Sequence, residues 1–139
     1  MKYYFSDPGI RNALLDFRQQ EEGLLMENIL YNELRMRGYK VDVGMVEYRT
    51  HDKNGNSMRK QLEVDFVVSQ GSRRYYIQSA LAMPTQEKVA QESASLRRIS
   101  DSFKKIIVVG DDIKPKRNED GILIIGIYDF LLKADSLDY

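Results

Sequence analysis

Apolar residues recur at helical spacing in the first part of the chain. Within the stretch 21–37 they fall three or four positions apart, and Gly38 follows the stretch directly. The residues that form this stripe are Met26, Ile29, Leu30 and Leu34. The spacing predicts an amphipathic helix from Glu21 to Arg37, with Gly38 as its C-terminal stop.

The spacing then changes to alternation, which predicts strands. One alternating run begins at Val41, and a second runs from about Arg59 through Val68. The polar segment 52–56 between them has the composition of a loop that closes a hairpin. After a turn at 70–72, the aromatic and β-branched run 73–80 predicts a third strand that pairs with the second. We therefore expect three strands in meander order after the first helix.

The second half of the chain combines another amphipathic helix with two apolar strands. Pro84 offers a helix start, and the helix is predicted to reach about Ser102. Its apolar face carries Val89, Leu96, Ile99 and Phe103. The continuous apolar run 105–109 predicts a parallel strand that is covered on both faces. After a charged loop at 111–120, residues 121–127 predict one more buried strand.

A short C-terminal helix is expected around 129–133. The element order is then α-β-β-β-α-β-β-α. This order predicts an α/β fold in which helices flank a mixed central β-sheet. At 139 residues the chain is long enough for one core, so we expect one domain at 21–139, with residues 1–20 as an N-terminal lead or joint.

Composition limits the chemistry that this domain can support. The 21 basic and 21 acidic residues give zero net charge, so there is no general electrostatic attraction to a polyanion. The chain has no cysteine and a single histidine, His51, which excludes disulfides, thiolate metal sites and a histidine cluster for zinc. Chemistry must rest on carboxylates, lysines, hydroxyls or a hard cation such as Mg²⁺.

Other sequence signals are absent. No Gly-rich loop is followed by Lys-Ser or Lys-Thr, so this chain does not bind ATP in the P-loop manner. The N-terminus lacks the apolar run of a signal peptide, and no stretch approaches the ~20 apolar residues of a membrane helix. We expect a cytoplasmic domain with no membrane partner and no cofactor of its own, and Mg²⁺ is the one candidate to be weighed against that expectation.

Two acidic residues on the second strand are the first candidates for a site. Strand alternation places Glu63 and Asp65 on one face together with Val67, while Val64 and Phe66 point to the other face. A buried carboxylate is costly unless it is paired or binds a cation. The alternative is that the strand end is solvated and both acids are surface residues.

The next strand carries Gln78 and Ala80 on one face. A glutamine oxygen can bind a hard cation but supplies no charge to neutralise it. Ala80 offers neither a proton nor an ammonium group to a phosphoryl transition state. The alternative is that both are ordinary positions in a central strand.

Two further acids lie on the predicted helices. Glu27 borders the stripe of the first helix, and Glu92 lies three residues after Val89 and four before Leu96, so that it faces inward. An inward glutamate needs a partner, and a structural salt bridge or a cap is the alternative to a ligand role. The basic pairs at 73–74 and 97–98 either contact phosphate or are solvated charge.

This element order, with these residues on it, resembles the PD-(D/E)xK nuclease-like fold. The chain is more closely similar to one branch, the uncharacterised C-terminal domain of prokaryotic AAA-type P-loop ATPases, and the similarity covers essentially all 139 residues. Four segments carry it, namely KYYFSDPGIRNA at 2–13, GLLMENILYNEL at 23–34, EVDFV at 63–67 and YYIQ at 75–78.

The resemblance implies a restriction-endonuclease-like core with a vestigial metal site. In the wider fold, the positions matching Glu27, Asp65 and Gln78 would hold the metal, and Ala80 stands where the catalytic lysine would be. The resemblance also implies that a P-loop ATPase module, which would bind ATP, precedes this domain and is its partner. That module is absent from the present sequence.

Three hypotheses about function follow. The first, which we favour, is a catalytically degenerate accessory domain of the ATPase that acts in binding or regulation. The second is an active Mg²⁺-dependent DNA endonuclease in which Lys60, Arg73 or Arg74 takes the role of the lysine. The third is a protein-interaction domain with no nucleic-acid role. DNA is one further expected partner, and a second copy of the chain, bound through the aromatic residues 3–5, is another.

Overall fold

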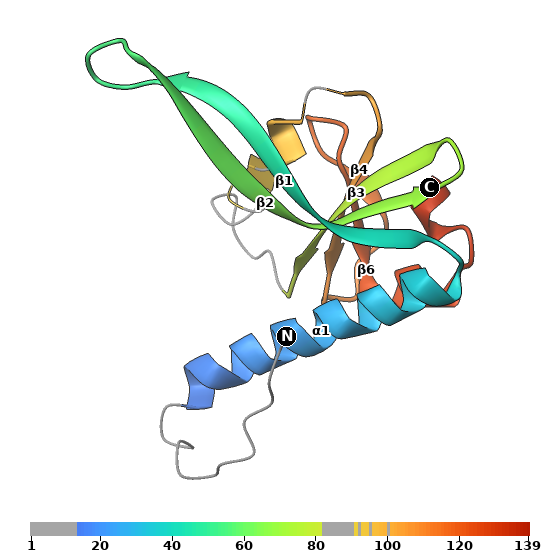
Figure 1. The fold of residues 1–139 in the computed structure, drawn as a ribbon. Coiled ribbons are helices and arrows are strands. Elements are labelled where there is room, and N and C mark those ends of the chain that lie inside the picture. The colour runs from blue at the N-terminus through green and yellow to red at the C-terminus, as the bar shows by residue number, and fades with distance from the viewer. Residues whose placement is uncertain (1–13, 82–90, 92, 95, 100) are drawn as a thin grey trace.

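The computed structural model describes residues 14–81, 91, 93–94, 96–99 and 101–139 (Figure 1). Residues 91, 93, 94, 96 and 97 are helical and lie within the helix predicted between Pro84 and Ser102. The remaining elements are α1 (Leu14–Met36), β1 (Lys40–His51), β2 (Ser57–Gln70), β3 (Arg73–Ala80), β4 (Lys104–Val109), β5 (Lys116–Arg117), β6 (Leu123–Gly126), α3 (Ile127–Leu132) and the 3-10 helix η2 (Ser136–Asp138).

The six strands form one mixed sheet in the order β1-β2-β3-β4-β6-β5. Strands β1, β2 and β3 are antiparallel neighbours, whereas β3, β4 and β6 run parallel. This confirms the predicted α/β fold with a mixed sheet, including the predicted parallel strand at 105–109. The loop predicted at 111–120 contains the short edge strand β5, which pairs antiparallel with β6.

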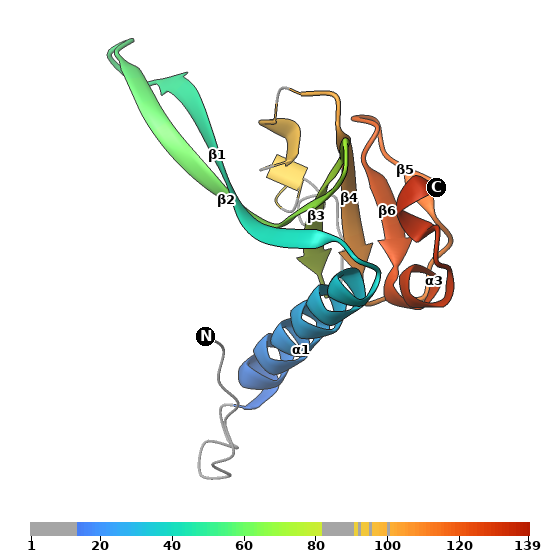
Figure 2. The same ribbon diagram turned by 45° about the vertical axis from the view of Figure 1, so that its right-hand side comes forward.

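Each face of the sheet carries its own hydrophobic cluster. On one face, Met26, Leu30 and Leu34 of α1 and Phe130 of α3 pack against alternate residues of the strands (Figure 2). On the other face, Leu96 packs on a second set of residues, which are Val64, Tyr76, Ala80, Ile107, Val109 and Ile124 of the strands and Ile122 just before β6. Residues 106–109 of β4 are buried throughout, as expected for a parallel strand that is covered on both faces.

Two helix predictions need correction. The first helix begins at Leu14 and not at Glu21, and Ile29, which was assigned to its buried stripe, is 36% exposed. Phe103 does not lie on the second helix, because it directly precedes β4 and is 40% exposed. The end of the first helix is close to the prediction, since Gly38 has a φ of 88° and the amide of Tyr39 donates to the carbonyl of Leu34.

A β-bulge interrupts the alternation of β2. The pair Asp42↔Val67 is followed by Gly44↔Val64, so that Val43 alone stands opposite two residues of β2. A side chain at Gly44 would not fit, because a Cβ there would lie 2.3 Å from a methyl group of Val67. The bulge overturns the prediction that Val64 and Phe66 share a face, since Phe66 lies in the α1 cluster and Val64 in the opposite one.

Beyond the bulge, β1 and β2 leave the rest of the sheet as a two-stranded arm. The β2–β3 ladder runs from Gln70↔Arg73 to Phe66↔Ile77, whereas the β1–β2 ladder continues to His51↔Ser57. Figures 1 and 2 both show this hairpin reaching away from the other strands. We define the arm as residues 45–63. Its closing loop is 52–56, as predicted.

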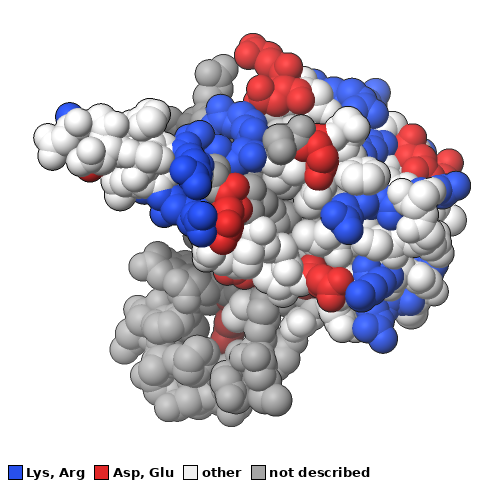
Figure 3. Space-filling view, turned by 45° about the horizontal axis from the view of Figure 1, so that its top comes forward, with Lys and Arg blue, Asp and Glu red and all other residues white. Residues whose placement is uncertain are grey.

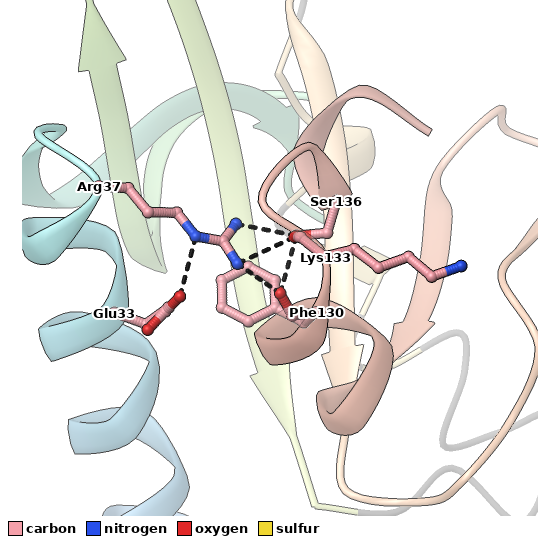
Figure 4. Close-up of polar contacts among 5 residues, drawn as sticks. All are labelled: Glu33, Arg37, Phe130, Lys133 and Ser136. Carbon is pink, nitrogen blue, oxygen red and sulfur yellow. Dashed lines mark hydrogen bonds and ion pairs between the residues drawn. The ribbon is translucent and has the colours of Figure 1, made fainter.

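The end of α1 is tied to α3 by Arg37 (Figure 4). Its guanidinium donates to the carbonyls of Phe130 at 2.5 Å and Lys133 at 3.1 Å, and to Ser136 Oγ at 2.9 Å. It also pairs with Glu33 at 3.0 Å and lies 4.8 Å from the centre of the Phe130 ring. The Phe130 carbonyl also accepts from Ser136 Oγ, and the Lys133 carbonyl from the Ser136 amide, so Arg37 adds a charged donor to the end of α3 from a distant part of the chain.

Candidate functional site

At the candidate site, β2 and β3 are joined by side chains where their backbone ladder ends. One residue beyond the pair Phe66↔Ile77, the amide of Asp65 donates to Gln78 Oε1 at 3.1 Å. The amide of Ser79 donates to Asp65 Oδ2 at 2.8 Å. Each side chain therefore accepts a hydrogen bond from the backbone of the opposing strand. We call Asp65, Gln78 and Ser79 the cross-strand clasp.

The clasp accounts for these residue types in structural terms. Asp65 is the bulged part of β2, so its amide and that of Ser79 lie where the ladder ends. Asp65, Gln78 and Ser79 are all partly buried, and a buried amide without an acceptor costs about 1–3 kcal/mol. A carboxylate and a side-chain amide both provide the required oxygen. The structure thus brings Asp65 and Gln78 together, as the sequence suggested, but as supports for the backbone.

Ala80, at the position where the resemblance would place a lysine, is 4% exposed. It packs in the second hydrophobic cluster, with Val109 of β4 as its cross-strand partner and Ile107 in the same cluster. An ammonium group at this position would be enclosed by aliphatic side chains, which is unfavourable without a charged partner. The alanine therefore fits its surroundings as a core residue.

The other predicted acids are not gathered around the clasp. Glu63 is exposed on the arm, where it stands opposite Met45. Glu27 is partly buried on α1, directly after the buried Met26. Glu92 and the aromatic residues 3–5 lie outside the described residues. Within the described part of the chain, no three acidic or histidine side chains come together in a way that could hold a metal ion.

The three residues considered as substitutes for the lysine lie far along the strands from the clasp. Lys60 is on the arm opposite Tyr48, five residues or roughly 16 Å from Asp65. Arg74 stands opposite Ser69, four residues or roughly 13 Å from Gln78, and Arg73 is one residue further. None of these three residues is next to Ala80, which is the last residue of β3.

A second polar group lies at the start of β4, and sequence analysis did not find it. Tyr76 donates its hydroxyl proton to Asp101 Oδ2 at 2.5 Å, and Asp101 Oδ1 accepts from the amide of Phe103 at 3.0 Å. Lys105 donates to the carbonyl of Asp101 at 2.7 Å. Burial, followed by the hydrogen bond to Asp101, raises the pKa of Tyr76. The phenol therefore stays protonated and acts as a donor.

A shallow pocket of about 380 Å³ lies beside this group. Its lining consists of Leu96, Arg97, Lys105, Asp120 and Ile122. In the sequence, this pocket was indicated only by its basic residues. No spacing rule relates a residue of the second helix to the loop before β6, so the pocket itself could not be predicted. The lining carries both basic residues and an acidic one, so its charge does not indicate one class of ligand.

Comparison with known families gives a match over residues 22–130, to the family described as "Domain of unknown function (DUF4143)". The match contains the clasp, the arm and Glu27. The chain belongs to the DUF4143 family. The match ends at Phe130, so Lys133 and Ser136, which Arg37 contacts, lie beyond the matched part of this DUF4143 domain.

A relative of this DUF4143 domain occurs in Haemophilus influenzae (strain ATCC 51907 / DSM 11121 / KW20 / Rd), in a protein named only as uncharacterized. The two sequences are 30% identical over 132 residues. The aligned region covers 95% of the present chain but 29% of the relative, so the chain spans less than a third of that protein's length. Among the described helices, none is long and apolar enough to cross a membrane.

Proposed function

We propose that this DUF4143 domain is a non-catalytic accessory module of a larger AAA-type ATPase, and that it uses a nuclease-like framework for binding or regulation. The observation that carries the proposal is the clasp. Two of the three side chains that would hold a metal in a nuclease of this kind, Asp65 and Gln78, accept backbone hydrogen bonds, and the lysine position is the buried Ala80.

The requirements of metal-dependent phosphodiester hydrolysis support the proposal that this domain does not cleave DNA. A hard cation takes six or more oxygen ligands and is usually held by carboxylates, and it activates the attacking water. Here Gln78 contributes no charge, and no group that could transfer a proton replaces the lysine at Ala80. Losing such electrostatic groups costs about 10³-fold or more in rate. We therefore expect the domain to retain the framework without the reaction.

The resemblance and the length of the relative support the accessory role. The segments at 23–34 and 63–67 are similar to the C-terminal domain of prokaryotic AAA-type ATPases. The Haemophilus influenzae relative is more than three times as long as the aligned region, which leaves room for an ATPase module in that protein. The larger protein, its ATP hydrolysis and the contact between its modules are part of the proposal.

Cleavage assays test the catalytic part of the proposal. Supercoiled plasmid and branched DNA are incubated with the purified protein in Mg²⁺ and then in Mn²⁺, with the Asp65→Ala variant in parallel. We expect no nicking above background from either protein. Saturable, cation-dependent cleavage that disappears in Asp65→Ala would show an active endonuclease and would end the proposal.

Activity of the larger protein tests the accessory part. In the full-length protein that contains this domain and an ATPase module, deletion of residues 22–130 should change the rate of ATP hydrolysis or its response to a bound partner. If the rate and the response are both unchanged, the domain has no regulatory role.

A further inference from the structure

The arm is a ribbon whose outer part is separated from the rest of the molecule. Seven cross-strand pairs, from Met45↔Glu63 to His51↔Ser57, lie beyond the bulge. At about 3.3 Å per residue, the ribbon extends roughly 20 Å before its loop. A two-stranded ribbon is one of the two protein elements that fit the major groove of B-DNA. The shape alone does not select a ligand, but the charge of the outer part of the arm, residues 49–60, does.

Positive charge is concentrated in the outer arm, residues 49–60. This segment contains four exposed basic residues and one acidic residue, so its net charge is +3. The basic residues are Arg49, Lys53, Arg59 and Lys60, and the acid is Asp52. Because the whole chain has 21 basic and 21 acidic residues, the remainder has 17 basic and 20 acidic residues and a net charge of −3. A neutral chain thus has a cationic outer arm.

The single acid of the outer arm has a structural task. Asp52 Oδ1 accepts the amides of Asn54 at 2.9 Å and Asn56 at 2.8 Å, which shapes the loop. Its carboxylate is therefore turned toward the loop backbone and is not placed opposite an arginine. The charge of the basic side chains is left for an external anion.

Two arginines face each other across the ladder. Arg49 and Arg59 are direct cross-strand partners, so their side chains leave from the same face of the ribbon. Like charges in this position destabilise a strand pair. The neighbouring pair on this face is Glu47↔Gln61, in which Gln61 Nε2 donates to Glu47 Oε1 at 3.1 Å, so Glu47 is engaged across the ladder. A repulsive arginine pair at the end of a projecting ribbon is explained if an anion lies between the two guanidinium groups when a partner is bound.

We propose that the arm is a DNA-binding ribbon, in which Arg49 and Arg59 straddle the phosphate backbone of a duplex and Lys53 in the closing loop contacts a neighbouring phosphate. Phosphate oxygens accept the planar fork of an arginine in two hydrogen bonds. Further basic side chains gather beside the foot of the arm on the face shown in Figure 3, so a duplex held there would meet additional positive charge. This inference deepens the proposed function and rests on it, because it names the partner of a module that binds without cutting.

Duplex binding measured in EDTA tests the inference, since no metal is then present and cleavage cannot contribute. Fluorescence anisotropy of a labelled duplex is followed between about 50 and 200 mM salt, the range in which counterion release changes affinity steeply. The test variant is Arg49→Gln with Arg59→Gln. The control is Lys114→Gln with Lys116→Gln, which removes two exposed charges near β5 at the opposite edge of the sheet.

For the arm variant we expect about tenfold weaker binding, and a plot of log affinity against log salt that is shallower by about 1.8, which corresponds to two lost phosphate contacts. Its melting temperature should be unchanged or higher, because a like-charge pair is removed. The control variant should bind as the unaltered protein does.

Three results would overturn the inference. They are no duplex binding at the lowest salt, equal weakening in the arm and control variants, and displacement of the duplex by polyglutamate at equal charge concentration. The third result would assign the arm to an acidic protein surface. None of them bears on cleavage in Mg²⁺, so failure of this inference is distinct from failure of the proposed function.

Discussion

The parallel strands of the body and the outer parts of β1 and β2 differ in how their side chains are covered. Residues 106–109 of β4 and 123–126 of β6 are all buried, and each strand lies between two neighbours in the sheet. On β1 and β2, by contrast, Val43 is 65% exposed, Met45 58% and Met58 40%. The same sheet thus contains a region whose side chains are buried and a region in which several of the described apolar side chains are exposed.

The difference indicates where stability and binding reside. A two-stranded ribbon is marginally stable in water by itself, because it buries little apolar surface. Substitution of charged residues on the arm should therefore have little effect on the fold, whereas loss of one buried methyl group from the body costs about 0.5–1.5 kcal/mol.

Truncation of one aliphatic side chain in each region tests the contrast most strongly. Ile106→Ala should lower the free energy of unfolding by about 2–5 kcal/mol, because Ile106 is fully buried and its removal leaves a cavity. Met58→Ala on the arm should change it by about 0.5 kcal/mol or less. Chemical denaturation measures both. Similar losses in the two variants would contradict the division into body and arm.

Removal of Arg37 should have the next largest effect. Arg37→Met leaves two carbonyls and a serine hydroxyl near the end of α3 without their charged donor, and we expect a loss of about 2–3 kcal/mol. Arg37→Lys should recover less than half of it, since an ammonium group cannot reproduce the planar fork. Arg35→Met, two residues earlier and exposed, is the control. Hydrogen exchange in α3 should accelerate in Arg37→Met and not in the control.

Much of the fold could be predicted from the sequence because its signals are local. Gly38 marked the end of α1, the segment 52–56 marked the hairpin loop, and the uninterrupted apolar run 105–109 marked a doubly covered parallel strand. Each of these signals lies within a few consecutive residues, so it can be recognised without knowing which distant residues are in contact.

The candidate site could be predicted only in part, because its geometry depends on tertiary contacts. Alternation drew attention to Asp65 and Gln78, but the bulge that places them arises from the fit of β1 against β2. The one sequence signal for it was Gly44 within a strand, which favours a bulge or a close backbone approach. The bond between Tyr76 and Asp101 had no signal, since it joins residues 25 positions apart without a periodic relation.

The clasp should contribute less to stability than Arg37. Asp65→Ala and Gln78→Ala each leave one partly buried amide without its acceptor, so we expect a loss of about 1–2 kcal/mol for each. The two bonds hold the same strand junction, and the double variant should therefore depart from additivity by about 0.5 kcal/mol or more. Glu63→Ala, on the exposed arm, is the matched control and should have little effect. Additive losses would show that the two bonds act independently.

The last effect we expect is a pH dependence that arises in the body. Tyr75 is buried between Tyr39 and the C-terminal segment, and its hydroxyl donates to Asp138 Oδ1 at 2.8 Å. Burial, then the hydrogen bond to Asp138, raises the pKa of Tyr75 from 10.0 to about 12. Because the folded state keeps this proton to a higher pH than the unfolded state, the associated stability is fully present below pH 10 and is lost as pH rises toward 12. Denaturation midpoints measured across this window should fall more steeply for the unaltered protein than for Tyr75→Phe, which has no phenolic proton to lose. Equal slopes would mean that Tyr75 ionises alike in the folded and unfolded chains, and that the bond to Asp138 does not hold its proton.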